Sequence, residues 1–264
     1  MKITALVENK SACELAAVHG LSLYIETEEH KLLFDLGPDQ TLLKNAEKRG
    51  IDLTKVDTVV ISHGHFDHGG ALDAFLKMNH TAKIYVQRKA FEKHFSKSLG
   101  FVKVPIGLDR QLENHHQVVL VEGEQRLDRE LLLFTVTDTA KFYSAANDTL
   151  YDEKGRDSFA HEQNLMIFAE KNVLVMGCGH CGVVNILERA AEYRPEVCIG
   201  GYHLTIPALK RTVPEEILEG IAGELRQYDM DFYTCHCTGE KAFEYLAKRV
   251  DRMRYFACGD ELLL

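Results

Sequence analysis

The stretch VVISHGHFDHGGAL, residues 59–72, decides the fold and the chemistry expected of this chain. Its first residues are apolar and β-branched, which favours a buried strand. Directly after that strand come four side chains that can bind metal, namely His63, His65, Asp67 and His68. Alternate residues of extended backbone point the same way, so His63 and His65 can converge on one ion. The turn that follows can present Asp67 and His68 to a second point, and the neighbouring glycines allow the sharp bend.

Imidazole and carboxylate groups bind zinc, iron and manganese, and an imidazole-rich site favours the transition metals. The alternative interpretation is a polar surface loop in which histidines are scattered by chance. The order HxHxDH immediately after a buried strand disfavours that alternative. We therefore predict a centre for two divalent metal ions, with zinc as the first choice and iron or manganese as alternatives.

Outward from this stretch, strands and helices alternate along the chain. Apolar runs predict strands at Lys2–Val7, Leu21–Thr27, Lys31–Asp35, Val56–Ile61, Lys83–Val86, Val118–Val121, Leu131–Val136, Leu165–Ala169, Val173–Met176, Val197–Gly200, Asp231–Thr234 and Met253–Ala257. Helical patterns cover Thr41–Arg49, Leu72–Met78, Ala90–Ser98, Val183–Glu192, Pro214–Gln227 and Glu240–Arg249. Early strands followed by alternating strands and helices predict an α/β fold with sheets sandwiched between helices. No linker or repeat interrupts the pattern, so we expect one domain over residues 1–264.

The composition excludes several classes of partner. Asp and Glu number 40 against 31 Lys and Arg, a formal net charge of −9, which disfavours non-specific binding to nucleic acid or to anionic membranes. A small anionic substrate remains compatible, because bound metal can outweigh the mean charge. Seven cysteines, with no apolar leader and no membrane-spanning run, predict free thiols in a reducing cytoplasm. The oligomeric state does not follow.

The motif HxHxDH after a buried strand resembles the metallo-β-lactamase superfamily. The resemblance runs through nearly the whole chain, in the segments SLYIET, LLFDLGPD, EQNLMIF, GCGHCGVVNIL, IGGYHL and HCTGEKAFEYL. These segments are similar to a subfamily that includes dihydropterin-6-methyl-ribofuranosylaminobenzene-phosphate synthase of methanopterin biosynthesis and many metal-dependent hydrolases. The resemblance implies a four-layer αββα sandwich with a dinuclear metal site at the edge of its sheets.

The resemblance also implies the remaining ligands. His180, after a predicted strand, corresponds to the third histidine of the first metal, with His161 as a competing candidate. His236 corresponds to the last ligand of the second metal. Asp35 matches an aspartate that orients a ligand histidine, although it could instead cap the helix that follows.

Cys178 stands where many relatives carry a bridging aspartate. Its thiolate could bridge the metals, or it could lie beside them and leave the bridge to water, and both possibilities remain open. A structural zinc site made by Cys178-x-x-Cys181 and Cys235-x-Cys237 is a rival interpretation, which the tight CxC spacing disfavours. Packing as free thiols is the simpler expectation for the other cysteines.

Such a centre would hydrolyse an ester, thioester, lactone or phosphodiester through a hydroxide that bridges the metals. Asp67 could accept or hold its proton, and His203 could act as an acid or oxyanion donor or serve only a structural role. The resemblance adds a pterin-related or phosphate-containing small molecule as substrate. The alternatives are a di-iron redox protein of the same fold and a lactonase or phosphodiesterase.

Two further expectations concern residues outside the motifs. Substrate contacts are expected in the irregular middle of the chain, from Lys103, Arg110, Lys141, Phe142 and Tyr143. The histidines without metal-ligand spacing are expected to be exposed to solvent, namely His19, His30, His80, His94, His115 and His116.

Overall fold

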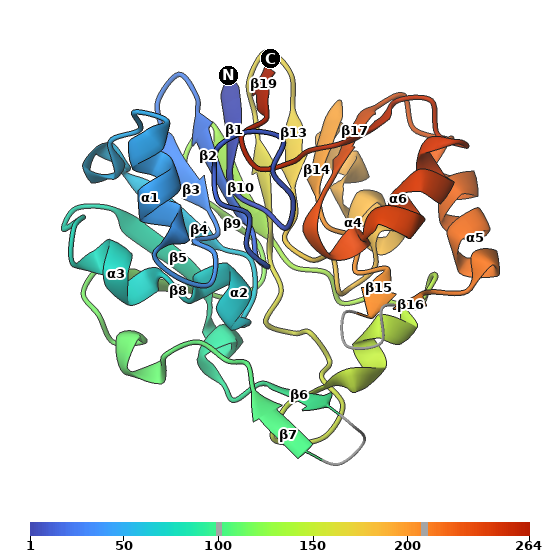
Figure 1. Ribbon diagram of the computed structural model, residues 1–264, viewed down its shortest axis with the longest axis horizontal. Coiled ribbons are helices and arrows are strands. Elements are labelled where there is room, and N and C mark those ends of the chain that lie inside the picture. Colours follow the sequence, from blue (N-terminus) through green and yellow to red (C-terminus); the bar gives the residue numbers. More distant parts are fainter. Residues whose placement is uncertain (99–101, 207–210) are drawn as a thin grey trace.

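Two seven-stranded sheets form the centre of the computed structural model, which describes residues 1–98, 102–206 and 211–264 (Figure 1). The first sheet has the order β19 (Glu261–Leu263), β1 (Lys2–Val7), β2 (Ser22–Glu26), β3 (Lys31–Phe34), β4 (Thr58–Ile61), β5 (Lys83–Gln87) and β8 (Val118–Val121). The second has the order β18 (Met253–Tyr255), β17 (Asp231–Thr234), β14 (Val197–Gly200), β13 (Val173–Val175), β12 (Asn164–Ile167), β10 (Leu131–Phe134) and β9 (Gln125–Arg126).

Helices cover the outer face of each sheet, so the predicted four-layer αββα architecture is confirmed (Figure 1). The first sheet carries α1 (Thr41–Lys48) and α3 (Leu72–Leu76), and the short α2 (Phe66–Gly69) lies between them in sequence. The second sheet carries α4 (Val183–Ala190), α5 (Glu215–Leu225) and α6 (Glu240–Ala247). None of the helices in the described part of the chain has the length and apolarity needed to cross a membrane.

Strand β4 shows why its sequence is apolar on both faces. Val59 and Ile61 pack in the core beneath α1 and α3, whereas Val60 packs in the core between the two sheets. A strand buried on both faces loses the alternation of polar and apolar residues and becomes a continuous apolar run. Each fully buried branched side chain of this kind contributes roughly 1.5–3 kcal/mol to folding.

Parallel pairing brings the site together. Strands β3, β4, β5 and β8 run parallel to one another, as do β13, β14, β17 and β18. The carboxyl ends of parallel strands lie at one edge of a sheet, where α/β proteins place their ligands. The residues that follow β3, β4, β13, β14 and β17 therefore meet at a common edge of the sandwich.

The middle of the chain departs most from the prediction. The helix expected at Ala90–Ser98 is wrong, because the structure has a short 3-10 helix η2 (Arg88–Phe91) followed by strand β6 (Phe95–Ser98). That strand pairs with β7 (Val102–Pro105) and β11 (Leu150–Tyr151), and such tertiary pairing overrides local helix propensity. Further short elements are η1 (Leu53–Lys55), η3 (Arg110–Leu112), η4 (Ala145–Thr149), η5 (Ala191–Tyr193), η7 (His236–Thr238), β15 (Thr205–Ile206) and β16 (Arg211–Thr212).

Candidate metal centre

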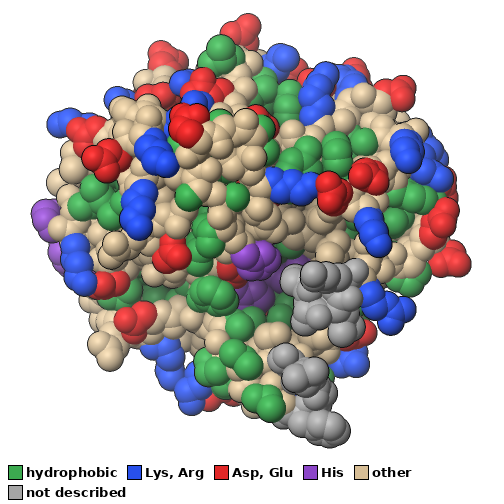
Figure 2. Space-filling model, in the orientation of Figure 1, with side chains coloured by type: hydrophobic (Ala, Val, Ile, Leu, Met, Phe, Trp, Pro, Cys, Tyr) green, Lys and Arg blue, Asp and Glu red, His purple; other side chains and the backbone are tan. Residues whose placement is uncertain are grey.

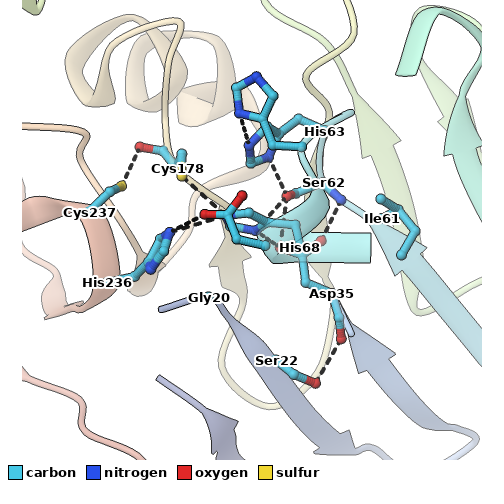
Figure 3. Close-up of polar contacts among 12 residues, drawn as sticks. Gly20, Ser22, Asp35, Ile61, Ser62, His63, His68, Cys178, His236 and Cys237 are labelled. Carbon is cyan, nitrogen blue, oxygen red and sulfur yellow. Dashed lines mark hydrogen bonds and ion pairs between the residues drawn. The ribbon is translucent and has the colours of Figure 1, made fainter. Parts of the chain in front are cut away.

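Asp35 organises the loop that follows β4. Its carboxylate accepts the backbone N–H of Ser62 at 2.7 Å and the Ser62 hydroxyl at 2.7 Å, and it accepts Nδ1–H of His68 at 2.6 Å (Figure 3). Asp35 is fully buried and has left-handed backbone, with φ of 63°. The prediction that this aspartate orients a ligand histidine agrees with these contacts.

Three histidine rings converge at a first position. Nε2 of His63 lies 3.0 Å from Nδ1 of His65 and 3.3 Å from Nε2 of His180. All three residues are buried, and this burial is the main reason that their pKa values lie well below the usual range. The positive charge that neighbouring histidines would carry lowers these pKa values further. The three rings are therefore neutral and available as metal ligands.

The proton positions of His63 and His180 follow from their other contacts. Ser62 donates its hydroxyl proton to Asp35, so its oxygen accepts Nδ1–H of His63 at 2.9 Å. Nδ1 of His180 lies 3.0 Å from Oδ1 of Asn147, which can only accept. Each neutral ring carries one proton, so the two facing Nε2 atoms have lone pairs with no proton between them. A cation bound by both nitrogen atoms would remove the repulsion between their lone pairs.

A second position lies beside the first and mixes donor types (Figure 3). Nε2 of His68 is 3.2 Å from Nε2 of His236, and Oδ2 of Asp67 is 3.8 Å and 3.4 Å from these two atoms. Burial opposes ionisation of Asp67, but His68, His19 and His236 together hold its pKa well below the usual range. For His68, burial by itself lowers the pKa, but the carboxylates of Asp35 and Asp67 outweigh burial and raise the pKa overall.

These spacings fit a metal ion. Nitrogen and oxygen ligands at about 2.0–2.1 Å from a tetrahedral zinc lie roughly 3.3 Å from one another. The donor atoms of both positions are 3.0–3.8 Å apart. The residues named from the sequence are thus brought together with the separations that coordination requires.

Cys178 lies between the two positions. Its sulfur is 3.2 Å from Nε2 of His68. It belongs to three groups whose ligand atoms lie within 4.8 Å of one another: one with His63 and His68, one with His180 and His203, and one with His236 and Cys237. Burial raises the pKa of its thiol well above the usual range. A bound metal has the opposite effect and favours the thiolate. Because Gly177 has no Cβ, this loop can approach Ser62 Oγ, which a side chain there would overlap.

Of the four cysteines of the rival zinc site, the fold brings Cys178 and Cys237 together and places Cys181 and Cys235 elsewhere. Cys181 packs in the core beneath α4 and contacts the carbonyl oxygens of Val136 and Phe159, whereas Cys235 lies in the core between the sheets. Cys237 is different from both, because it lines the cavity at the centre. The sequence did not predict this position of Cys237, because only the fold brings η7 against Cys178.

His161 is placed behind His65 and takes part in hydrogen bonds with both ring nitrogens. Nδ1 accepts the backbone N–H of Gly64 at 2.9 Å, so the proton of the neutral ring is on Nε2, which faces Asp157 at 3.2 Å. Asp157 also contacts Nδ1 of His94 at 2.8 Å. Burial raises the pKa of Asp157, but the bonds from His161 and His94 lower it overall. Both ring nitrogens of His161 thus face protein groups, whereas Nε2 of His180 faces His63.

The centre opens into a cavity of about 210 Å³. In Figure 2 histidine side chains lie in a hollow of the surface, next to hydrophobic side chains. Its lining includes His65 and His180 of the first position and Asp67 and His236 of the second. The apolar side chains of Phe66, Ile106, Leu150 and Ile206 also line it. None of the five middle residues expected to contact substrate is among the described residues that line this cavity.

Two other histidines face the cavity. His203 is buried and has left-handed backbone, with φ of 45°, and its ring is tilted against that of His180 with 4.1 Å between the ring centroids. Neither of its ring nitrogens has a hydrogen-bond partner among the described residues. His19 was expected to be merely exposed, yet its Nε2 lies 3.3 Å from Oδ2 of Asp67. His94 was also expected to be exposed and is instead buried against Asp157.

Comparison with known proteins agrees with this architecture. The family model of the metallo-β-lactamase superfamily matches residues 16–137. The chain is 28% identical to 7,8-dihydropterin-6-methyl-4-(β-D-ribofuranosyl)-aminobenzene-5′-phosphate synthase of Methanocaldococcus jannaschii, over 85% of this chain and 82% of that protein. It is 23% identical to the uncharacterised protein MJ0448 of the same organism, over 93% and 94% of the two chains. The crystal structure of Tm1679, described as a metal-dependent hydrolase of the β-lactamase superfamily, superposes with a TM-score of 0.84 at 26% identity, over 100% and 99% of the chains.

A four-layer sandwich with a cluster of histidine, aspartate and cysteine at one sheet edge defines a metal-dependent hydrolase. Residues 16–137 match the metallo-β-lactamase superfamily, and the whole chain has the fold of a hydrolase of that superfamily. The resemblance inferred from HxHxDH is therefore confirmed at the level of family and fold.

Proposed function

We propose that the centre holds two divalent metal ions and hydrolyses a small substrate. His63, His65 and His180 would hold the first ion, and Asp67, His68 and His236 the second, and the sulfur of Cys178 lies near enough to both positions to serve as a further donor. The observation that carries this proposal is the buried contact of 3.3 Å between Nε2 of His63 and Nε2 of His180, two atoms that the hydrogen bonds at Nδ1 of each ring leave without a proton. Two metal ions supply a shared water of lowered pKa as nucleophile and polarise the bond under attack.

The chain's own residues then serve the reaction. Asp67 is held as a carboxylate beside the second position and would orient the attacking water by accepting its proton. His203 faces the same cavity with free ring nitrogens and would donate a hydrogen bond or a proton to the oxygen that gains charge. Zinc is the metal that best suits the mixture of imidazole, carboxylate and thiolate donors.

The volume of the cavity suits a small reacting group. Pockets that enclose drug-sized ligands measure roughly 300–1,000 Å³, and this one measures about 210 Å³. A phosphate-bearing pterin compound, suggested by the 28% identical synthase, would place only its reacting end there. The apolar wall of Phe66, Ile106 and Leu150 favours a second candidate, hydrolysis of a lactone or ester whose acyl group packs on it.

The test is a substrate panel with metal-loaded protein. Phosphodiester, lactone, thioester and dihydropterin phosphate substrates are assayed with the wild type and with the His63→Ala and Asp67→Ala variants. We expect turnover in at least one class and its loss in both variants. Equal turnover by the variants would show that the centre is not the site of reaction.

A further inference from the structure

The two late histidines are held by the same pair of hydrogen bonds, each from a single asparagine. Asn147 in η4 places Oδ1 3.0 Å from Nδ1 of His180 and donates Nδ2–H to the carbonyl oxygen of the same residue at 2.9 Å. Asn9, just after β1, places Oδ1 2.9 Å from Nδ1 of His236 and donates Nδ2–H to its carbonyl oxygen at 3.2 Å. These segments are far apart in sequence, yet the contacts are alike.

The chemistry of an amide fixes the direction of both pairs. A carbonyl oxygen only accepts, so the amide nitrogen of each asparagine must face the histidine backbone. The amide oxygen then faces the ring, and Nδ1 must carry the proton. At Asn9 the orientation is fixed twice, because Oδ1 also accepts the backbone N–H of Gly20 at 3.2 Å. Nε2 is left unprotonated in both rings.

We propose that Asn147 and Asn9 are positioning residues, one for each metal position, that hold His180 and His236 with Nε2 directed at the ions. This inference rests on the proposed metal centre. The two early histidines are held by a charged group instead. The carboxylate of Asp35 contacts His68 directly and His63 through Ser62. Thus His63 and His68, from the first half of the chain, are tied to an anion, and His180 and His236, from the second half, are tied to neutral amides.

The experiment measures Zn²⁺ affinity by competition with a chelator, for which two binding steps are expected in the wild type. Asn147→Ala should weaken, by about 10–100-fold, the step that His180→Ala abolishes, and should spare the other step. Asn9→Ala should do the reverse, weakening the step that His236→Ala abolishes. Each asparagine variant is thereby the matched control for the other.

Asn147→Asp separates positioning of the ring from support of the loop. A carboxylate still accepts Nδ1–H but cannot donate to the His180 carbonyl, so we expect affinity within a few-fold of the wild type. A purely structural role predicts that this variant loses as much affinity as Asn147→Ala. Asn79→Ala removes a buried amide that bonds the carbonyls of Leu53 and Val56, away from the centre. It should lower stability and leave both binding steps unchanged.

The outcomes are distinguishable. Wild-type protein that binds no metal would overturn the proposed function and this inference together. Wild-type protein that binds two ions, with Asn147→Ala and Asn9→Ala binding them equally well, would overturn this inference alone.

Discussion

The two proposed metal positions lie side by side, yet they differ in charge. The first is built from the neutral rings of His63, His65 and His180, whose pKa values are lowered by burial. The second includes the carboxylate of Asp67, while the sulfur of Cys178 lies between the two positions. Anionic donors neutralise a divalent ion in a buried site, where an uncompensated charge is costly. The second position should therefore retain its ion more strongly, and the first should lose its ion sooner to a chelator.

The largest effect should follow from removing one ligand at each position. His63→Ala and Asp67→Ala should each lower kcat/KM by roughly 10³-fold, about 4 kcal/mol, because each removes a ligand and the metal's stabilisation of charge with it. Steady-state assays on the best substrate of the panel provide the measurement. His80→Ala, at an exposed site, serves as control. Full activity in either ligand variant would remove its position from the mechanism.

Asp35→Asn tests whether both positions depend on one buried anion. Asparagine tolerates the left-handed backbone of Asp35, so the substitution changes mainly the charge. We expect metal affinity to fall by about 10–100-fold, since the carboxylate orients His68 and, through Ser62, His63. Chelator competition measures the loss at each binding step. A change confined to the step of His236 would contradict the shared role of Asp35.

Cys178→Ser sharpens the comparison through metal preference. Replacing sulfur by oxygen should lower Cd²⁺ affinity by about tenfold or more and leave Mn²⁺ affinity nearly unchanged, because thiolates favour soft metals. Titration of both ions into wild type and variant reports the difference, with Cys181→Ser as the matched control in the same loop. Loss of Cd²⁺ affinity in the control instead would place the sulfur ligand elsewhere.

The smallest effect on metal binding is expected for His161→Ala. Its ring is occupied by Gly64 and Asp157, so metal affinity should change by less than tenfold, whereas His180→Ala should abolish one binding step. Stability should fall by about 1–3 kcal/mol, because a buried N–H and a carboxylate lose their partner. Denaturant unfolding measures that loss. A variant as deficient in metal as His180→Ala would make His161 a ligand.

Part of the proposed centre follows from local rules, and part was named only by the family resemblance. His63, His65, Asp67 and His68 are adjacent in sequence, and His180 and His236 each follow an apolar strand whose end lies at the ligand-binding edge. The order of strands and helices predicted sheets sandwiched between helices, and the family resemblance added the four-layer arrangement and the ligand roles of His180 and His236.

What escaped prediction depends on contacts between distant segments. Asn9, Asn147 and His19 carry no spacing that marks them, and only the tertiary fold brings them to the ligands. Strand β19 is three residues long and is defined by pairing with β1. His94 was judged exposed because its sequence surroundings are polar, but Asp157 provides a buried partner 63 residues away.

The most direct test of the account is the metal content of the wild type and of two variants after equilibrium dialysis against Zn²⁺, measured by elemental analysis. We predict two ions per chain for the wild type and one each for His180→Ala and His236→Ala. Wild-type protein that binds no zinc, or variants that bind as many ions as the wild type, would contradict two adjacent positions that are completed by different strands.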